Sequence, residues 1–242
     1  MEYPNHHNFG DNVTSIYFNN KNSYADFGLT ITDMVNIPVA NEVIDKLDSG
    51  HTIKTGKYLP IELPITFRAK DLLHVLKYQS ELIRWFKDIK DNKLTFSFMR
   101  NQYYLVKSVE IENISRDFGK YNTISVLFTL EPFRYEAQEP ILTFLFQEPI
   151  HYHGTVEGEG RYEVYGKGTV TFQINDTSMT VKNVDGSVII DSKYLVVLDG
   201  NTLQSKVKDV SGDFPVLTYG PNDIIWGSNV EAVIVERRTA YL

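Results

Sequence analysis

The sequence predicts a mainly β protein with one α-helix, and three observations support this prediction. Residues 69–90 place apolar side chains three and four positions apart, which is the period of an amphipathic helix. The segments on either side of this stretch alternate between apolar and polar residues, as strands do. Aromatic residues make up 13% of the 242 residues, which suits half-buried, pleated sheets. We therefore expect an N-terminal β domain that contains the helix, followed by a second, all-β domain.

The helix is predicted over residues 69–90. Its apolar face consists of Leu72, Val75, Leu76, Leu82, Ile83, Phe86 and Ile89. Trp85 is expected beside this face, where it packs on the domain or faces a neighbouring subunit. Asp71 in the first turn and Lys87 and Lys90 in the last turn have the charges that the helix dipole favours. We expect no catalytic role for this helix.

Strands and turns are predicted for most of the remaining N-terminal domain. Residues 15–37 fit two short strands joined by a polar turn at residues 19–23, which is rich in Asn. Longer strands are expected at residues 59–67, 94–100, 103–111 and 122–130, with turns at 100–102 and 116–120. Residues 38–56 lack sustained periodicity and carry two glycines, so we predict an extended arm or long hairpin there.

A domain boundary is predicted at residues 131–140, which contain two prolines and three carboxylates and show no periodicity. The three carboxylates, Glu131, Glu136 and Glu139, are expected on a solvated face. The two domains are therefore predicted at residues 1–135 and 136–242. Short strands recur in the second domain, at residues 169–174, 179–184, 187–191, 194–198, 223–226 and 231–236. The dipeptides at 185–186 and 199–200 are both Asp-Gly, which favours tight turns, so we expect a β-sandwich.

Composition excludes several classes of function. The chain has no cysteine, so disulfides, zinc–thiolate sites and a cysteine nucleophile are excluded. The formal net charge is −7, which disfavours binding to nucleic acid. The first residues lack the basic and apolar regions of a signal peptide, and no stretch approaches the roughly 18 apolar residues of a membrane span. We expect a protein that stays in the compartment where it is made, or leaves it as part of an assembly.

No motif in the sequence predicts catalysis, a cofactor or a metal. His151 and His153 would share one face of a strand, but a metal site needs a third ligand, so a polar strand edge is the better interpretation. The glycine pairs at 158–160 and 166–168 do not continue into a phosphate-binding loop and do not open a helix. No Gly-x-Ser-x-Gly elbow is present. The chain is therefore predicted not to be an enzyme.

The order of these segments resembles one known protein family. The N-terminal part of the resemblance runs from Ile16 to Tyr135, and the C-terminal part runs from Tyr165 to Arg238. The segments that carry it include DFGL at 26–29, IELPITFR at 61–68, LIRWF at 82–86, ISVLFTLEPFRYE at 124–136, GKGTV at 166–170, GDFP at 212–215 and YGPNDI at 219–224. On these segments the chain resembles the distal tail (Dit) proteins of siphophages, the phages with long, non-contractile tails, that infect Gram-positive bacteria.

The resemblance implies a split-barrel N-terminal domain with one helix and a galectin-like C-terminal β-sandwich. Six copies would close into a ring that continues the tail tube, and the arm at 38–56 would reach the next subunit. The arm residues implied in this contact are Val43, Ile44, Leu47 and Ile53. The sandwich would dock other baseplate proteins. The implied partners are further copies of the chain, the tail tube protein, the tape-measure protein, a tail-associated lysin or tail fibre hub, and receptor-binding or baseplate proteins.

The resemblance therefore implies a structural, non-catalytic hub at the virion tail tip, assembled in the host cytoplasm and not secreted. DNA would pass through the ring, and a net charge of −7 suits a lumen that does not bind phosphate. A carbohydrate-binding adhesin is the main alternative, with a partner or sugar surface at Tyr219 or Trp226. The sugar-binding motifs of galectins are absent: Tyr-His-Gly follows His151, and Gly-Ser-Asn-Val-Glu follows Trp226. A cell-wall hydrolase is the third and weakest hypothesis.

Overall fold

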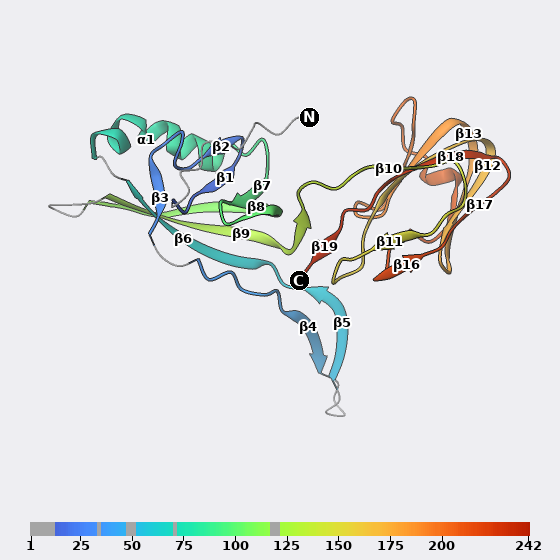
Figure 1. Cartoon of the computed structure of the whole chain (residues 1–242), viewed down its shortest axis with the longest axis horizontal. Coiled ribbons are helices and arrows are strands. Elements are labelled where there is room, and N and C mark those ends of the chain that lie inside the picture. The colour runs from blue at the N-terminus through green and yellow to red at the C-terminus, as the bar shows by residue number, and fades with distance from the viewer. Residues whose placement is uncertain (1–12, 33–34, 47–51, 70–71, 117–121) are drawn as a thin grey trace. The chain divides into compact units, whose positions relative to one another are not determined.

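The computed structural model describes residues 13–32, 35–46, 52–69, 72–116 and 122–242, with backbone alone at 45–46, 52–55, 72–78 and 115–116 (Figure 1). The described chain is mainly β, as the sequence predicted, and contains one α-helix. It forms two compact units, which we call the N-terminal unit (Met1–Ala137 and Leu242) and the C-terminal unit (Gln138–Tyr241). No helix in the described ranges is long and apolar enough to cross a membrane.

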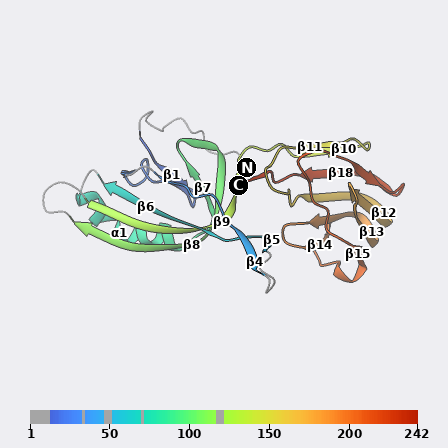
Figure 2. The ribbon, with the colours of Figure 1, turned by 90° about the horizontal axis from the view of Figure 1, so that it is seen from below.

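The N-terminal unit contains an antiparallel sheet with the strand order β2-β1-β7-β8-β9-β6-β3. Its strands are β1 (Ile16–Phe18), β2 (Lys21–Asn22), β3 (Leu29–Ile31), β6 (Ile61–Ala69), β7 (Lys93–Phe96), β8 (Met99–Arg116) and β9 (Asn122–Glu136). The long strands β6, β8 and β9 of this sheet lie side by side (Figure 2). The sheet curls, so that β3 at one edge hydrogen-bonds to residues beside β1 and β2 at the other edge. The Ile31 N–H donates to the Thr14 carbonyl at 2.9 Å, and the Leu29 N–H donates to the Ser23 carbonyl at 2.8 Å. The predicted split barrel is confirmed as a curled half-barrel.

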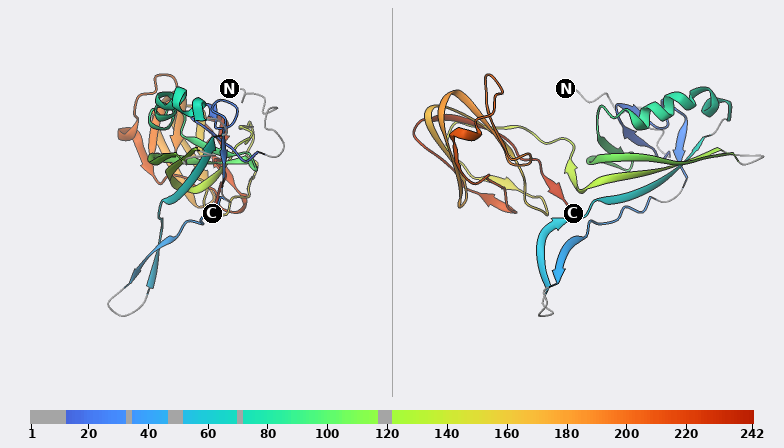
Figure 3. Two further views of the ribbon diagram at one scale, coloured as in Figure 1. Left: turned by 90° about the vertical axis from the view of Figure 1, so that its left-hand side faces the viewer. Right: turned by 180° about the vertical axis from the view of Figure 1, so that it is seen from behind.

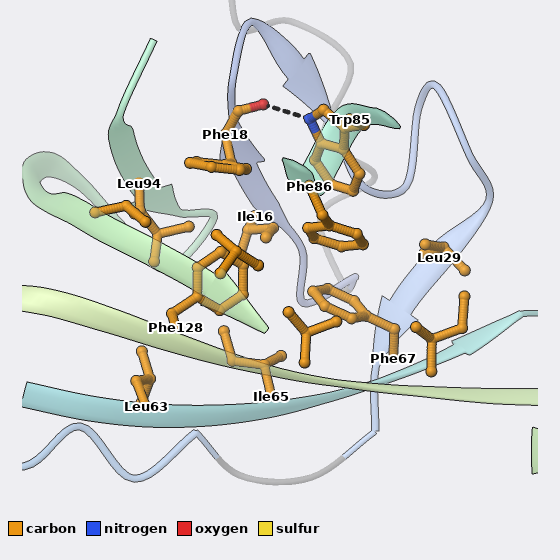
Figure 4. Packing of buried hydrophobic residues seen from close by; sticks show 14 of the residues in the cluster. Ile16, Phe18, Leu29, Leu63, Ile65, Phe67, Trp85, Phe86, Leu94 and Phe128 are labelled. Carbon is orange, nitrogen blue, oxygen red and sulfur yellow. Dashed lines mark hydrogen bonds between the residues drawn. The ribbon is translucent and has the colours of Figure 1, made fainter. Parts of the chain in front are cut away.

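The helix α1 (Leu72–Lys87) closes the core of this half-barrel. Phe18, Phe67, Phe86 and Phe128 are all buried there, and alternate residues of β6 point into the same core, as expected for a strand with one buried face (Figure 4). Trp85 is 4% exposed. Its aromatic ring therefore packs on its own domain.

The structure corrects the predicted helix in two respects. Ala69 ends β6 and Lys90 lies beyond the helix, so α1 is shorter at both ends than predicted. Ile83 is 39% exposed and does not belong to the apolar face, whereas Leu82 and Phe86 do. Asp71 lies outside the described residues, as do the side chains of Leu72, Val75 and Leu76.

The turns were predicted with mixed success. The polar turn after β1 is confirmed, and Asn19 and Asn20 hold the positive φ angles, 46° and 61°, that such a tight turn requires. The turn predicted at 100–102 is wrong, because these residues are part of β8. The chain turns at Ser97 and Phe98 instead, since Phe96 pairs with Met99. The turn predicted at 116–120 falls almost wholly on residues 117–121, which are outside the described chain.

The arm predicted at residues 38–56 contains a β-hairpin. Its strands are β4 (Glu42–Lys46) and β5 (Thr52–Tyr58), which form a separate two-stranded sheet. The hairpin projects away from the main sheet of the N-terminal unit (Figure 3). Its ladder is irregular between Glu42 and Ile44, and Gly56 in β5 has a φ angle of 71°.

The C-terminal unit contains ten strands and a short 3-10 helix, η1 (Val207–Asp209). The strands are β10 (Leu142–Phe144), β11 (Ile150–Tyr152), β12 (Arg161–Ile174), β13 (Thr177–Asp191), β14 (Val196–Asp199), β15 (Val210–Gly212), β16 (Gly220–Asn222), β17 (Ile224–Trp226), β18 (Val230–Glu236) and β19 (Ala240–Tyr241). One sheet has the order β10-β18-β12-β13-β14, with β15 on β13 and β17 on β12. A small sheet of β11 and β16 contributes Ile150 and Tyr152 to the same core. β18 completes the large sheet by pairing with both β10 and β12.

The long strands β12 and β13 bend near Gly166, so that one half of β12 pairs with β18 and the other half pairs with β17. A side chain at position 166 would place Cβ 2.4 Å from the Asn229 carbonyl oxygen, which only glycine avoids. Gly186 pairs with Gly166, so the Asp-Gly turn predicted at 185–186 is wrong and lies inside β13. The hairpin turn is at Asn175 and Asp176 instead. The turn predicted at 199–200 is present at the end of β14.

The chain between the two units is shorter than the predicted boundary segment. β9 continues through Pro132 to Glu136, so residues 131–136 are strand. Glu131 accepts a hydrogen bond from the Tyr135 hydroxyl at 3.0 Å. Glu139 forms an ion pair with Arg237 at 3.0 Å and accepts hydrogen bonds from Thr239. These two carboxylates therefore stabilise local structure and do not form a solvated acidic linker.

Candidate functional site

The residues singled out for metal chemistry do not form a metal site. Within the described ranges, no three His, Cys, Asp or Glu side chains are grouped closely enough to hold an ion. His151 and His153 are exposed on and beside β11. The carbonyl of His151 accepts a 3.0 Å hydrogen bond from Arg237, and the His153 ring lies 6.1 Å from the Tyr241 ring. The candidate sites are therefore surfaces that could contact other macromolecules.

The first candidate surface is the arm, which we define as the β4–β5 hairpin and its flanking residues. Ile44 is 52% exposed and Val43 is half-buried. Val39 and Leu59, on either side of the hairpin, are also exposed. A segment with this many exposed apolar side chains is typical of an interaction site. Leu47 lies outside the described residues, as does the side chain of Ile53.

Aromatic and apolar contacts attach the base of the arm to the half-barrel. The rings of Tyr58 in β5 and Phe133 in β9 meet edge to face at 5.1 Å. A cavity of about 120 Å³ separates the arm base from the sheet and is lined by residues that include Ile37, Ile61, Tyr104, Arg134 and Leu242. Burial raises the pKa of Tyr104 to about 12, and Arg134 opposes this effect. The tyrosine is therefore neutral at physiological pH.

The second candidate surface lies at the C-terminal end of α1, where one side chain connects the helix to the β1–β2 turn. The Asn19 amide nitrogen donates to the carbonyls of Trp85 and Asp88, at 2.8 and 2.7 Å. The Asn19 amide oxygen accepts from the N–H groups of Lys90 and Asp91, at 2.8 and 3.2 Å. A side-chain amide thus satisfies backbone groups that a helix end leaves without partners. An adjoining cleft of about 300 Å³ is lined by charged residues that pair with one another, such as Lys21 and Glu81 at 2.6 Å.

The third candidate surface is on the C-terminal unit, at the residues predicted for a partner or a sugar. Tyr219 is 81% exposed and immediately precedes β16. Trp226 ends β17, is half-buried and packs against the core. Tyr219 therefore lies in the bend before the small sheet, whereas Trp226 lies in the large sheet and is mainly a packing residue.

A fourth candidate surface was not predicted from the sequence. The start of β14, the loops on either side of it and the start of η1 expose five apolar side chains: Tyr194, Leu195, Val196, Leu203 and Val207. Leu195 and Leu203 have φ angles of 52° and 57°, which bulky side chains rarely adopt. The apolar run at residues 194–198 predicted a strand there and not an exposed loop.

An ion pair supports this loop region. Arg238 forms two hydrogen bonds with the Asp191 carboxylate, at 2.7 and 2.8 Å. Burial disfavours ionisation of Asp191, but the hydrogen bonds and charge of Arg238 outweigh burial and lower the Asp191 pKa. The Tyr194 ring lies over the Arg238 guanidinium at 5.5 Å. The loop is thus held in place while its apolar side chains stay exposed.

Comparisons with known proteins connect this fold to phage tails. Residues 52–130 match the family model described as the phage tail protein RIFT-related domain. This match covers β5, β6, α1, β7, β8 and most of β9. No curated protein matches the chain by sequence. The N-terminal unit is therefore similar in sequence to this phage tail domain.

One solved structure shows the same fold over most of the chain. The Dit protein (gp 19.1) of SPP1, described as a paradigm of the hub adsorption apparatus in phages that infect Gram-positive bacteria, matches with a TM-score of 0.59 and 11% identity. The match covers 92% of this chain and 97% of that chain. A chain of the phage P2 baseplate in its activated conformation with Ca matches with a TM-score of 0.45 and 9% identity, over 92% and 96% of the two chains. The fold is therefore Dit-like, and the resemblance predicted from the sequence is confirmed.

Proposed function

We propose that this chain is a structural, non-catalytic distal tail protein that forms a hexameric ring at the end of a phage tail. The N-terminal unit would form the ring, and the arm would contact the next subunit through Val43, Ile44, Leu47 and Ile53. The observation that carries the proposal is the projecting arm of exposed apolar residues on a phage tail domain. A closed ring needs two different surfaces on each subunit, and an arm with a separate receiving surface meets this requirement.

The C-terminal unit would be a galectin-like sandwich, and it would dock other baseplate or receptor-binding proteins. The exposed apolar loops around β14 support this role, since apolar side chains gathered on a surface favour contact with another protein. The ring would join the tail tube and tape-measure proteins to a tail-associated lysin or fibre hub at the virion tail tip. DNA would pass through the ring without specific binding.

The decisive experiment is mass measurement by light scattering, together with negative-stain imaging of the purified full chain. We expect a six-fold ring with about six times the 27.8 kDa mass of one chain. Replacing residues 42–58 by a short Gly-Ser linker should leave a folded monomer, because these residues form their own sheet and contribute few side chains to the core. A ring that persists after this replacement would contradict the role of the arm.

Carbohydrate binding by the C-terminal unit is the second candidate function, because the Tyr219 ring is exposed and could stack on a sugar. A glycan array with the full chain and with the Tyr219→Ala variant tests it. Binding that disappears in this variant would favour an adhesin. Binding to no glycan would favour a purely structural role.

A further inference from the structure

The large sheet of the C-terminal unit is closed at its β14 edge and open at its β10 edge. Beside β14 the chain folds back, because Leu198 forms a bridge with Ser205 and the Lys206 N–H donates to the Val197 carbonyl at 2.8 Å. At the opposite edge, β10 pairs with β18 and with no other strand of the described chain. The backbone groups of β10 that face away from β18 are therefore available to a strand from another molecule.

The side chains of β10 show that the core is incompletely covered at this edge. Leu142 and Phe144 pack against the core of the C-terminal unit, yet both are only half-buried. Their pairing partners on β18, Val235 and Val233, are fully buried. A further strand beside β10 would therefore remove the remaining apolar surface of Leu142 and Phe144 from water, which favours binding.

Three apolar side chains beside this edge face solvent. Ile141, Leu145 and Phe146 are each at least 62% exposed. Exposed apolar side chains next to unpaired strand backbone mark a surface that recruits a partner. Pro140 and Pro149 flank this stretch and have no N–H to donate, so pairing is limited to the residues between them. The edge therefore fits one short strand.

The unpaired charges at this edge are acidic. Glu148 follows β10, and Glu231 lies in β18 two residues before the first residue that pairs with β10. Both side chains are exposed, and neither forms an ion pair among the residues that the structure describes. A partner that binds this edge is therefore favoured if it carries Lys or Arg near the end that meets these carboxylates.

We propose that the β10 edge binds an extended segment of another protein, with alternating apolar and polar residues and a basic end. This inference rests on the proposed docking role of the C-terminal unit and names the chemistry of the partner. Strand addition gains affinity from main-chain hydrogen bonds, and the apolar side chains at the edge supply specificity. A second copy of β10 fits less well, because residues 138–149 contain no Lys or Arg to meet Glu148 and Glu231.

A labelled peptide of sequence Lys-Thr-Val-Thr-Val-Thr-Val-Lys tests this proposal on the full chain. Lysine at both ends makes the probe independent of strand direction. We expect saturable binding by fluorescence anisotropy, and hydrogen exchange should show protection of amides within 141–146 but not within 194–207. The same peptide with every Thr and Val backbone nitrogen methylated should not bind, because it has no donors for a strand ladder. A peptide with Glu in place of both lysines should bind about tenfold more weakly.

Two exposed leucines of the C-terminal unit provide matched variants. Leu145→Lys places a charge beside β10 and should weaken peptide binding by about tenfold. Leu203→Lys makes the same change at a side chain that is also 62% exposed but lies beyond β14, and it should leave the affinity unchanged. Glu148→Lys combined with Glu231→Lys should weaken binding of the lysine peptide and strengthen binding of the Glu peptide.

The results separate this proposal from the proposed ring. Rings in the wild type without saturable peptide binding would overturn the β10 proposal and leave the ring intact. A monomeric wild type that binds the peptide at residues 141–146 would overturn the ring and support the β10 proposal. Equal binding of the methylated peptide, or unchanged affinity in Leu145→Lys, would contradict strand addition. Self-association that Leu145→Lys abolishes and Leu203→Lys preserves would show that a second copy occupies the edge, and would also overturn the proposal.

Discussion

The Trp85 indole donates a 2.7 Å hydrogen bond from Nε1 to the backbone carbonyl of Phe18 (Figure 4). This contact joins the last turns of α1 to strand β1, although Phe18 and Trp85 are 67 positions apart in sequence. The Trp85 ring also packs on Phe27, at 4.8 Å between ring centres. A buried indole needs a partner for its N–H, and a strand-end carbonyl supplies one here. The position of Trp85 therefore determines which face of α1 is buried.

Two adjacent residues test this assignment of the buried face. Leu82 is buried and Ile83 is 39% exposed. We predict that Leu82→Asp unfolds the N-terminal unit, because an unpaired carboxylate would enter an apolar core. Ile83→Asp makes a similar chemical change one residue later, and we expect it to change the free energy of unfolding by no more than about 1 kcal/mol.

Thermal unfolding followed by circular dichroism measures both variants. The C-terminal unit has its own core and should remain folded in either case. Equal unfolding temperatures for the two variants would show that the buried face has been assigned wrongly.

Periodicity predicted the existence of α1 but not which residues it buries. The spacing of three and four residues placed Ile83 on the apolar face, because one-dimensional periodicity cannot distinguish the centre of a face from its margin. Trp85 is buried because Phe18 and Phe27, which are distant in sequence, supply its contacts. The buried face of α1 therefore includes Trp85 and does not include Ile83. Long-range contacts of this kind are not encoded in a local pattern.

The turns show a similar limit. Asn19 and Asn20 were predicted correctly because their side chains tolerate the positive φ angles of a tight turn. Asp185 and Gly186 have equally strong turn chemistry, yet they lie within β13 because Gly186 pairs with Gly166 where β12 and β13 bend. Within the described residues β8 has β9 as its only strand partner from Lys107 to Ile114, and this could not be predicted because it depends on where β7 ends.

Asn19 should be important for the stability of the N-terminal unit. We predict that Asn19→Ala lowers the free energy of unfolding by about 2–3 kcal/mol, because four hydrogen bonds are lost and alanine disfavours a φ angle of 46°. Asn20 is the matched control. Asn20→Gly keeps the turn, since glycine adopts positive φ readily, and should change stability by about 0.5 kcal/mol or less. Urea denaturation measures both variants, and equal losses would show that the Asn19 side chain does not fix the helix end.

Two buried tyrosines in the C-terminal unit should respond in opposite ways to loss of the hydroxyl. The Tyr162 hydroxyl is buried without a hydrogen-bond partner among the described residues, and burial raises its pKa. The Tyr152 hydroxyl donates to the Val156 carbonyl at 2.9 Å and accepts from the Ala240 N–H at 3.0 Å. We predict that Tyr162→Phe leaves stability unchanged or raises it by up to about 1 kcal/mol, because an unpaired polar group is removed.

Tyr152→Phe should lower stability by about 1–2 kcal/mol, because the Val156 and Ala240 groups lose their partner. Denaturant unfolding of the two variants under identical conditions makes the comparison. A larger loss for Tyr162→Phe than for Tyr152→Phe would mean that the Tyr162 hydroxyl has a partner, such as a buried water.

The pair formed by Asp191 and Arg238 should make the C-terminal unit less stable in acid. The Asp191 pKa is lowered in the folded state, so the unfolded chain binds a proton more readily than the folded chain does. The stabilisation is therefore complete above the unfolded pKa, about 3.9, and is lost as the pH falls through the lower, folded pKa. We predict that Asp191→Asn destabilises the unit at pH 7 and that the difference from the wild type shrinks below about pH 4.

Asp185→Asn is the control. Asp185 is almost fully exposed in its pair with Lys167 at 3.7 Å, so this variant should be as stable as the wild type across the whole pH range. Chemical denaturation at pH 7, 5, 4 and 3 gives the free energies, and a deficit in Asp191→Asn that stays constant with pH would show that packing at this position, and not its charge, provides the stability.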